Sequence, residues 1–153
     1  MNQTVTSSSS RRLRQLIRWL PAVVWMAVIF ALSSRTGDEL NTMLPFFQRW
    51  LPWMTDFNWG HFVAYFILAA TFDYALGVKA ERPLIKVFIV VLCGLYGVTD
   101  ELHQSWVGGR MMDAADVRND CIGALGWTVV AAIPPVKRLW CKFKKFGSQY
   151  RED

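Results

Sequence analysis

The stretch GVTDELHQSWVGGRMMDAADVRNDCIGALG, residues Gly97 to Gly126, decides how this chain folds and where it works. It is the most polar passage in the middle of the sequence, and it lies between two long apolar runs. Charged residues beside a membrane span are costly unless they are paired, solvated or used for function. If the flanking runs are membrane helices, this passage is therefore the working surface of the protein. Its polar residues include Asp100, Glu101, His103, Gln104, Arg110, Asp113, Asp116, Asn119 and Asp120.

The composition is that of a small membrane protein. The chain has 153 residues, which predicts one domain, and 53% of them are hydrophobic against 19% charged. The net charge is +5, and the basic residues stand just outside the apolar runs. This arrangement suits anionic lipid headgroups and argues against a nucleic-acid partner. The three cysteines are widely spaced and predict neither a disulfide framework nor a cysteine metal site.

Four apolar runs predict an all-α integral membrane bundle of four transmembrane helices, because each run has the ~20 residues that a span requires. Gly77 is the expected stop of the second helix, and Asp113 is the expected N-cap of the fourth. The first run has an alternative interpretation as a cleaved signal peptide ending at Ala31-Leu32-Ser33, although a retained helix is favoured. The runs cover residues 16–34, 59–78, 84–104 and 114–133.

The segments around these runs have distinct characters. Residues 1–15 are predicted to be a disordered basic tail, 16–136 the transmembrane domain, and 137–153 a basic cytoplasmic tail. The aromatic connection 35–58 is predicted to form short interfacial helices, because Trp and Phe favour the headgroup level and two prolines break any long helix. A loop folded over the bundle is the alternative for this connection.

The distribution of basic residues predicts the orientation in the cytoplasmic membrane. If the N-terminus is inside, four spans place 13 of the 17 lysines and arginines in cytoplasmic segments and four in outer segments. The positive-inside rule therefore predicts that both termini are cytoplasmic. The oligomeric state does not follow from the sequence.

The helical period places polar residues of three predicted helices on one outer site. His61 and Tyr65 are four residues apart on the second helix, and Asp100, Glu101 and Gln104 share a face of the third. The fourth helix repeats this spacing, and glycines continue the inward faces below. The predicted catalytic candidates are His61, Asp100, Glu101 and Asp116, and the predicted ligand-binding residues are Tyr65, Gln104, Arg110, Asn119 and Asp120.

Simpler roles exist for several of these residues. Asp113 is favoured as a cap, Asp116 could compensate the helix dipole, and Tyr65 alone would be ordinary packing. Asp73 is expected nearer the cytoplasmic end and is left outside the site. The spacing matches no standard metal signature, so no metal ligand and no cofactor is assigned. A zinc or hard divalent cation stays an alternative, with possible ligands His61, His103, Asp100, Glu101, Asp116 and Asp120.

The motifs WGHFVAYFILA at 59–69 and TDELHQSWVGGRMMDAADVRNDCIGALG at 99–126 resemble those of the VanZ-like membrane family. The Ser33-Ser34 pair also resembles the family's serine pair, whereas Gly60 stands where a charged residue often precedes the histidine. The resemblance covers about residues 20–133 and implies a small helical membrane protein. It also implies a link to resistance against the glycopeptide teicoplanin, which acts at the outer cell surface, without implying a defined reaction.

Two classes of function fit this site. The first is an enzyme acting on an envelope lipid or cell-wall precursor, since carboxylates beside a histidine can perform acid–base chemistry. The second is a non-enzymatic accessory protein that binds such a ligand, and a transporter is a third possibility. The expected partners are membrane lipids and a lipid-linked or cell-wall ligand.

Overall fold

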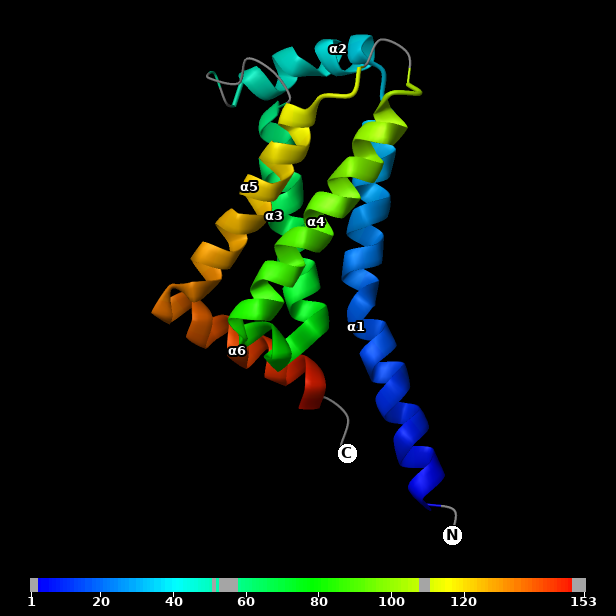
Figure 1. Cartoon of the computed structure of the whole chain (residues 1–153), viewed down its shortest axis with the longest axis vertical. Coiled ribbons are helices and arrows are strands. Elements are labelled where there is room, and N and C mark those ends of the chain that lie inside the picture. Colours follow the sequence, from blue (N-terminus) through cyan, green and yellow to red (C-terminus); the bar gives the residue numbers. More distant parts are fainter. Residues whose placement is uncertain (1–2, 51, 53–57, 108–110, 150–153) are drawn as a thin grey trace.

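The computed structural model describes residues 3–50, 52, 58–107 and 111–149, and these contain six α-helices, one 3₁₀ helix and no strand (Figure 1). The all-α fold class is thereby confirmed for the described residues. The elements are α1 (Gln3–Ser33), α2 (Gly37–Gln48), α3 (Asn58–Leu76), η1 (Gly77–Glu81), α4 (Pro83–Gln104), α5 (Ala114–Ala132) and α6 (Pro134–Gln149).

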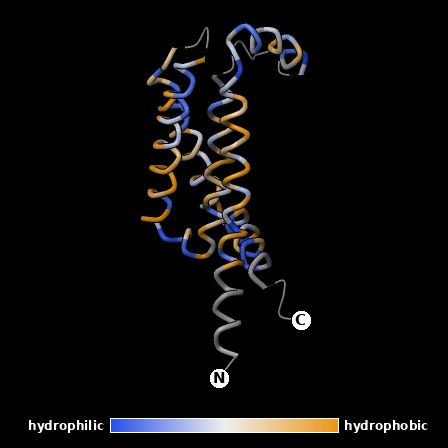
Figure 2. Tube along the Cα trace, turned by 90° about the vertical axis from the view of Figure 1, so that its right-hand side faces the viewer, coloured by the Kyte–Doolittle hydropathy of each residue, from blue (hydrophilic) through white to orange (hydrophobic). Residues whose placement is uncertain are grey.

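Four long helices form an elongated bundle. Helix α3 packs against α1, α4 and α5, and its buried side chains Tyr65, Leu68, Ala69 and Phe72 form the centre of the core. Helix α2 lies across the end of the bundle where α4 ends and α5 begins, and α6 lies at the opposite end (Figure 1). Hydrophobic residues dominate the middle of the long helices, as Figure 2 shows. The bundle therefore has two polar ends separated by an apolar middle.

Three helices are long and apolar enough to cross a membrane: Gln15–Ser33, Trp59–Glu81 and Pro83–Gln104. Large apolar side chains such as Val24, Leu95 and Val129 face outward and are more than half exposed, as lipid-facing residues would be. Helix α5 is not among the three, and its first two turns carry Asp116, Arg118 and Asp120. The structure thus supports a membrane protein with three candidate spans in its described part.

Several helix boundaries follow from local chemistry, as the sequence predicts. Gly77 ends α3 with a φ of +63°, a left-handed conformation that suits glycine. Asp113 caps α5 by accepting a hydrogen bond from the backbone N–H of Ala115 at 2.7 Å. Helix α2 begins with a capping box, in which Thr36 and Glu39 each bind the other's backbone N–H.

Other boundaries differ from the expectation. Helix α1 begins at Gln3, within the segment predicted to be disordered, and continues without a break into the apolar run. Helix α2, in contrast, agrees with the short helices predicted for the connection 35–58: it has 12 residues, contains Pro45 and ends at Gln48. The remainder of the predicted interfacial segment, residues 51 and 53–57, lies outside the described residues.

The basic tail forms helix α6, which the sequence interpretation did not assign. Val136, Leu139, Trp140 and Phe143 follow the i, i+3, i+4, i+7 spacing of one helical face. This amphipathic pattern was readable in the sequence, but the high content of lysine and arginine obscured it.

Candidate functional site

The structure brings the predicted polar residues of α3, α4 and α5 together near the end of the bundle that α2 covers. We call this group the His61 cluster, and all the predicted site residues belong to it except Arg110, which lies outside the described residues. Its members are His61, Tyr65, Asp100, Glu101, Gln104, Asp116, Asn119 and Asp120.

His61 lies between two acids of α5. Its Nδ1 is 2.9 Å from Oδ1 of Asp120, and its Nε2 is 3.7 Å from Oδ2 of Asp116. Asp120 is fully buried. When its carboxylate is ionised it only accepts hydrogen bonds, and Nδ1–H of His61 is then the donor of the shorter contact. Asp120 therefore fixes the orientation and the tautomer of the imidazole ring.

The acids of α4 connect the cluster to the neighbouring segments. Oδ2 of Asp100 accepts a hydrogen bond from Nε2 of Gln104 at 3.1 Å. The same Nε2 lies 3.4 Å from Oγ of Ser33, which is buried at the end of α1. Oε2 of Glu101 accepts a hydrogen bond from the backbone N–H of Asp113 at 2.9 Å and so ties the start of α5 to α4. All four long helices thus contribute to the cluster.

Two glycines allow α5 to approach its neighbours at this level. A Cβ atom at Gly97 would collide with the carboxylate of Asp120, so this glycine makes room for the acid against α4. A Cβ atom at Gly123 would collide with the backbone carbonyl of Phe62 on α3. Close contact between helices at small residues is typical of membrane bundles.

The cluster contains buried polar atoms that the described residues do not satisfy. The hydroxyl of Tyr65, Oε1 of Glu101 and Oδ2 of Asp120 have no hydrogen-bond partner within the described ranges. No lysine or arginine of these ranges forms an ion pair with Glu101 or Asp120. Because buried polar groups are nearly always hydrogen-bonded, these atoms mark where a ligand, an ion or water would bind.

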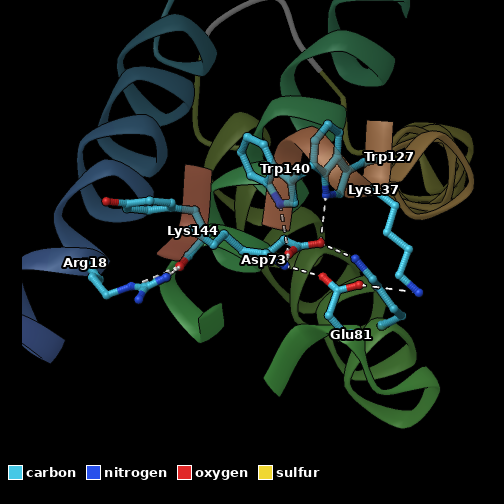
Figure 3. A network of polar contacts seen from close by, with 9 residues as sticks. Arg18, Asp73, Glu81, Trp127, Lys137, Trp140 and Lys144 are labelled. Atoms are coloured by element: carbon cyan, nitrogen blue, oxygen red, sulfur yellow. Dashed lines mark hydrogen bonds and ion pairs between the residues drawn. The ribbon is translucent and has the colours of Figure 1, made fainter. Parts of the chain in front are cut away.

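A second buried polar group, which we call the Asp73 cluster, lies near the other end of the bundle (Figure 3). Oδ1 of Asp73 accepts hydrogen bonds from Nζ of Lys144 at 2.7 Å and from Nε1 of Trp140 at 3.1 Å. Oδ2 accepts from Nζ of Lys86 and from Nε1 of Trp127 at 3.2 Å. Both oxygens of this fully buried carboxylate are therefore satisfied, by donors from α4, α5 and α6.

The Asp73 cluster extends to η1 and to α1. Glu81 of η1 forms ion pairs with Lys144 at 2.5 Å and with Lys137 at 3.7 Å. Arg18 of α1 donates hydrogen bonds to the backbone carbonyl of Tyr74, as Figure 3 shows. The cluster includes more basic than acidic groups and connects every element at this end of the bundle. We therefore call it a structural clamp, meaning that its ion pairs and hydrogen bonds hold these elements together.

The sequence interpretation missed the Asp73 cluster because its partners lie far apart in the chain. Lys144 follows Asp73 by 71 residues, in a helix that had not been predicted. A single aspartate inside an apolar run was nevertheless a signal, since a buried acid requires a partner of opposite charge.

His61 and the acids of its cluster have a chemical capacity that the Asp73 cluster lacks. A histidine held by one carboxylate and adjacent to others can transfer protons, and its free ring nitrogen can bind a cation. The other histidine, His103, instead stacks on Phe30 of α1, with ring centroids 4.1 Å apart.

Comparison with known proteins identifies the family. The model of the VanZ/LLP1 family matches residues 18–134, which include both polar clusters except for Lys137, Trp140 and Lys144. No curated protein and no solved structure matches the chain. Since the match covers most of the chain, and the apolar helices are those of a membrane protein, this chain belongs to the VanZ/LLP1 family.

Proposed function

We propose that this protein crosses the cytoplasmic membrane four times, with both termini in the cytoplasm and α5 as the fourth span. Helix α5 packs along α3 and α4, and its 19 residues extend about 28 Å, close to the thickness of the hydrocarbon core. Its charged residues lie in its first two turns, so the remainder is apolar. In this orientation the His61 cluster faces the extracytoplasmic side and α6 lies on the cytoplasmic surface, where its exposed lysines, such as Lys142, contact anionic lipids.

The His61 cluster is the proposed functional site, and it binds or acts on an envelope lipid or a cell-wall precursor. One observation carries the proposal: polar side chains from four packed helices converge there, and buried atoms of Tyr65, Glu101 and Asp120 find no hydrogen-bond partner among the described residues. Ionisable groups inside membrane helices are expensive and generally serve a function. A site at the outer end of the bundle reaches precursors in the outer leaflet, which is where glycopeptides act.

The residues divide into two proposed roles. His61 with Asp100, Glu101 and Asp116 supplies the acid–base groups, and Tyr65, Gln104, Asn119 and Asp120 bind the ligand. Arg110, between α4 and α5 in the chain, is proposed to hold a phosphate or carboxylate through a bidentate contact.

The alternative is a non-enzymatic protein that presents or transports the same ligand. The same hydrogen-bonding groups would serve it, because a binding site needs no proton transfer. Release of a chemically altered lipid by the purified protein would separate the enzyme from this alternative.

The test compares Asp100→Asn, Asp116→Asn and Arg110→Lys with the wild type in a host that responds to the expressed protein. Membrane abundance, melting temperature in detergent and glycopeptide susceptibility are measured for each variant. Asp38→Asn is the matched control, because Asp38 is an exposed acid in the first turn of α2.

The proposal expects that susceptibility changes for the site variants while their abundance and melting temperature stay near the wild-type values. The control variant should behave like the wild type. A loss of abundance that accounts for the whole phenotype would contradict the proposal. If the wild type confers no phenotype, binding of lipid-linked precursors to the same variants replaces the susceptibility measurement.

A further inference from the structure

We propose that His61, Asp100 and Glu101 bind a divalent metal ion of the kind that accepts both imidazole and carboxylate ligands, such as Zn²⁺ or Mn²⁺. One ligand atom from each of these three residues lies within 4.8 Å of the others. Ligands of one such ion stand about 2 Å from it and hence at most about 4 Å apart. Side-chain movements of about an ångström therefore bring all three atoms into one coordination shell.

The orientation of His61 is that of a metal-binding histidine. Its Nδ1 lies 2.9 Å from Oδ1 of Asp120, so with Asp120 ionised Nδ1–H is the donor and the lone pair of Nε2 is left for a cation. A carboxylate that accepts the second N–H of a ligating histidine is a regular feature of zinc sites, because it fixes the tautomer and makes the ligand more basic. Asp120 is fully buried and has no lysine or arginine partner in the described ranges, so it is suited to this role.

Independent evidence for a missing ligand comes from the unsatisfied atoms. The hydroxyl of Tyr65 is buried without a hydrogen-bond partner in the described part of the chain, one helical turn from His61 and near the charges of Asp120 and Asp100. Glu101 is 1% exposed, and its Oε1 has no such partner either. A metal ion with its bound water would satisfy both atoms.

The two clusters differ in how they balance charge. Asp73 and Glu81 pair with three lysines of the chain itself, namely Lys86, Lys137 and Lys144. Glu101 and Asp120 of the His61 cluster form no ion pair with a described lysine or arginine, and the imidazole that pairs with Asp120 carries at most one positive charge. Since buried carboxylates require compensation, a divalent cation would supply the charge that lysines supply at the other end.

The ligand types indicate the class of metal. Imidazole nitrogen with carboxylate oxygens suits zinc and manganese, whereas magnesium and calcium prefer oxygen ligands alone. Three protein ligands leave open positions, as catalytic metal sites do. This inference rests on the proposed function for its biological meaning. With the ion bound, His61, Asp100 and Glu101 serve as its ligands, Asp116 keeps the acid–base role, and the open positions would receive the phosphate or carboxylate of the envelope ligand. The presence of the ion is tested without that ligand.

The experiment uses the full chain in detergent, stripped with a chelator and then titrated with Zn²⁺ or Mn²⁺ alone. Bound metal is measured by calorimetry and by elemental analysis after desalting, and Co²⁺ is added as a spectroscopic probe of the coordination. The variants are His61→Asn, which keeps an N–H donor for Asp120, and Glu101→Gln, which keeps an acceptor for Asp113. His103→Gln is the control, since His103 lies outside the three-residue group.

We expect one ion per wild-type chain and per control chain, and a cobalt spectrum with ligand-field bands that depends on His61. Binding should be lost in His61→Asn and Glu101→Gln, and Asp120→Asn should weaken it about 10- to 100-fold, as the loss of such an orienting carboxylate does. Absence of stoichiometric binding by the wild type overturns the proposal, and so does wild-type affinity in both ligand variants. Melting curves in chelator show whether each variant is folded, and either folded variant suffices for the decision.

Metal binding and function can fail separately. A wild type that binds metal but has no effect on susceptibility or lipid binding would refute the proposed function and retain the metal site. If the wild type binds no metal while the site variants still change susceptibility or lipid binding, the metal site is refuted and the proposed function is retained.

Discussion

At the scale of single residues, the contacts of α5 depend on positions where a side chain would not fit. Gly123 faces the backbone of Phe62, which cannot move aside as a flexible side chain can. Gly126, one turn later, has only an ordinary contact, because a Cβ atom there would lie 3.6 Å from the ring of Phe66. The two glycines of the same helix thus differ in how much they constrain the packing.

Gly123→Ala should therefore destabilise the protein by about 1 to 3 kcal/mol, the usual range for overpacking. Gly126→Ala is the matched control and should leave the stability unchanged or raise it slightly, because alanine favours the helix. Unfolding in detergent, followed by circular dichroism, measures both variants. Equal melting temperatures for the two would show that α5 does not approach α3 as closely as the structure has it.

At the scale of secondary-structure elements, α6 is held by few interactions that lie close together in space. Lys144 is buried and binds both Asp73 and Glu81, and the ring of Trp140 packs edge-on against Trp127 at 4.8 Å. Leu139 is largely exposed on the same helix. The attachment of α6 to the bundle therefore depends mainly on Lys144 and Trp140.

Lys144→Met should loosen α6 while keeping a long apolar side chain at this position. In this variant the backbone amides of α6 should exchange with solvent at least several-fold faster than in the wild type, because the free energy needed to open the helix locally is lower. Lys142→Met is the control, since Lys142 is exposed on the same helix. Hydrogen exchange monitored by mass spectrometry compares the peptides of α6, and unchanged exchange in Lys144→Met would refute the clamp.

The sequence predicts most elements and the membership of the His61 cluster, since both depend on local patterns. Asp113 marks the start of α5, and the spacing of Asp100 and Gln104 places them on one face of α4. The sequence does not predict which carboxylate oxygens find hydrogen-bond donors, because these contacts depend on how the helices pack. Oε2 of Glu101, for example, accepts from the backbone N–H of Asp113 only because α4 and α5 meet there. The Asp73 cluster was also beyond prediction, since Lys86 and Lys144 approach Asp73 only when α4 and α6 pack.

At the scale of the whole molecule, the two clusters lie near opposite ends of an apolar bundle. The family match and three candidate spans make it a membrane protein, and the distribution of basic residues predicts which end is cytoplasmic. The Asp73 cluster lies at the end with α6 and most of the lysines. In the proposed topology, the His61 cluster lies on the extracytoplasmic side.

Reporter fusions test this orientation directly. A periplasm-active reporter should be active after Asn41 and after Met111, and inactive after Arg82. Activity after Arg82 alone would reverse the topology, and activity at only one of the two outer positions would mean that one predicted span does not cross. A cytoplasm-active reporter at the same three positions is the control and should give the complementary pattern.

The central claim is that the Asp73 cluster holds the fold whereas the His61 cluster is reserved for a ligand. The most direct test compares the melting temperatures of Asp73→Asn and Glu101→Gln in chelator-treated protein. Each change replaces one buried acid by a neutral amide of nearly the same size. Asp73→Asn removes the ion-pair partner of Lys86 and one of the two partners of Lys144, and it should cost about 3 to 5 kcal/mol, as the loss of a buried charge partner does. Glu101→Gln should melt near the wild type, and an equal or larger loss of stability in Glu101→Gln would contradict the account.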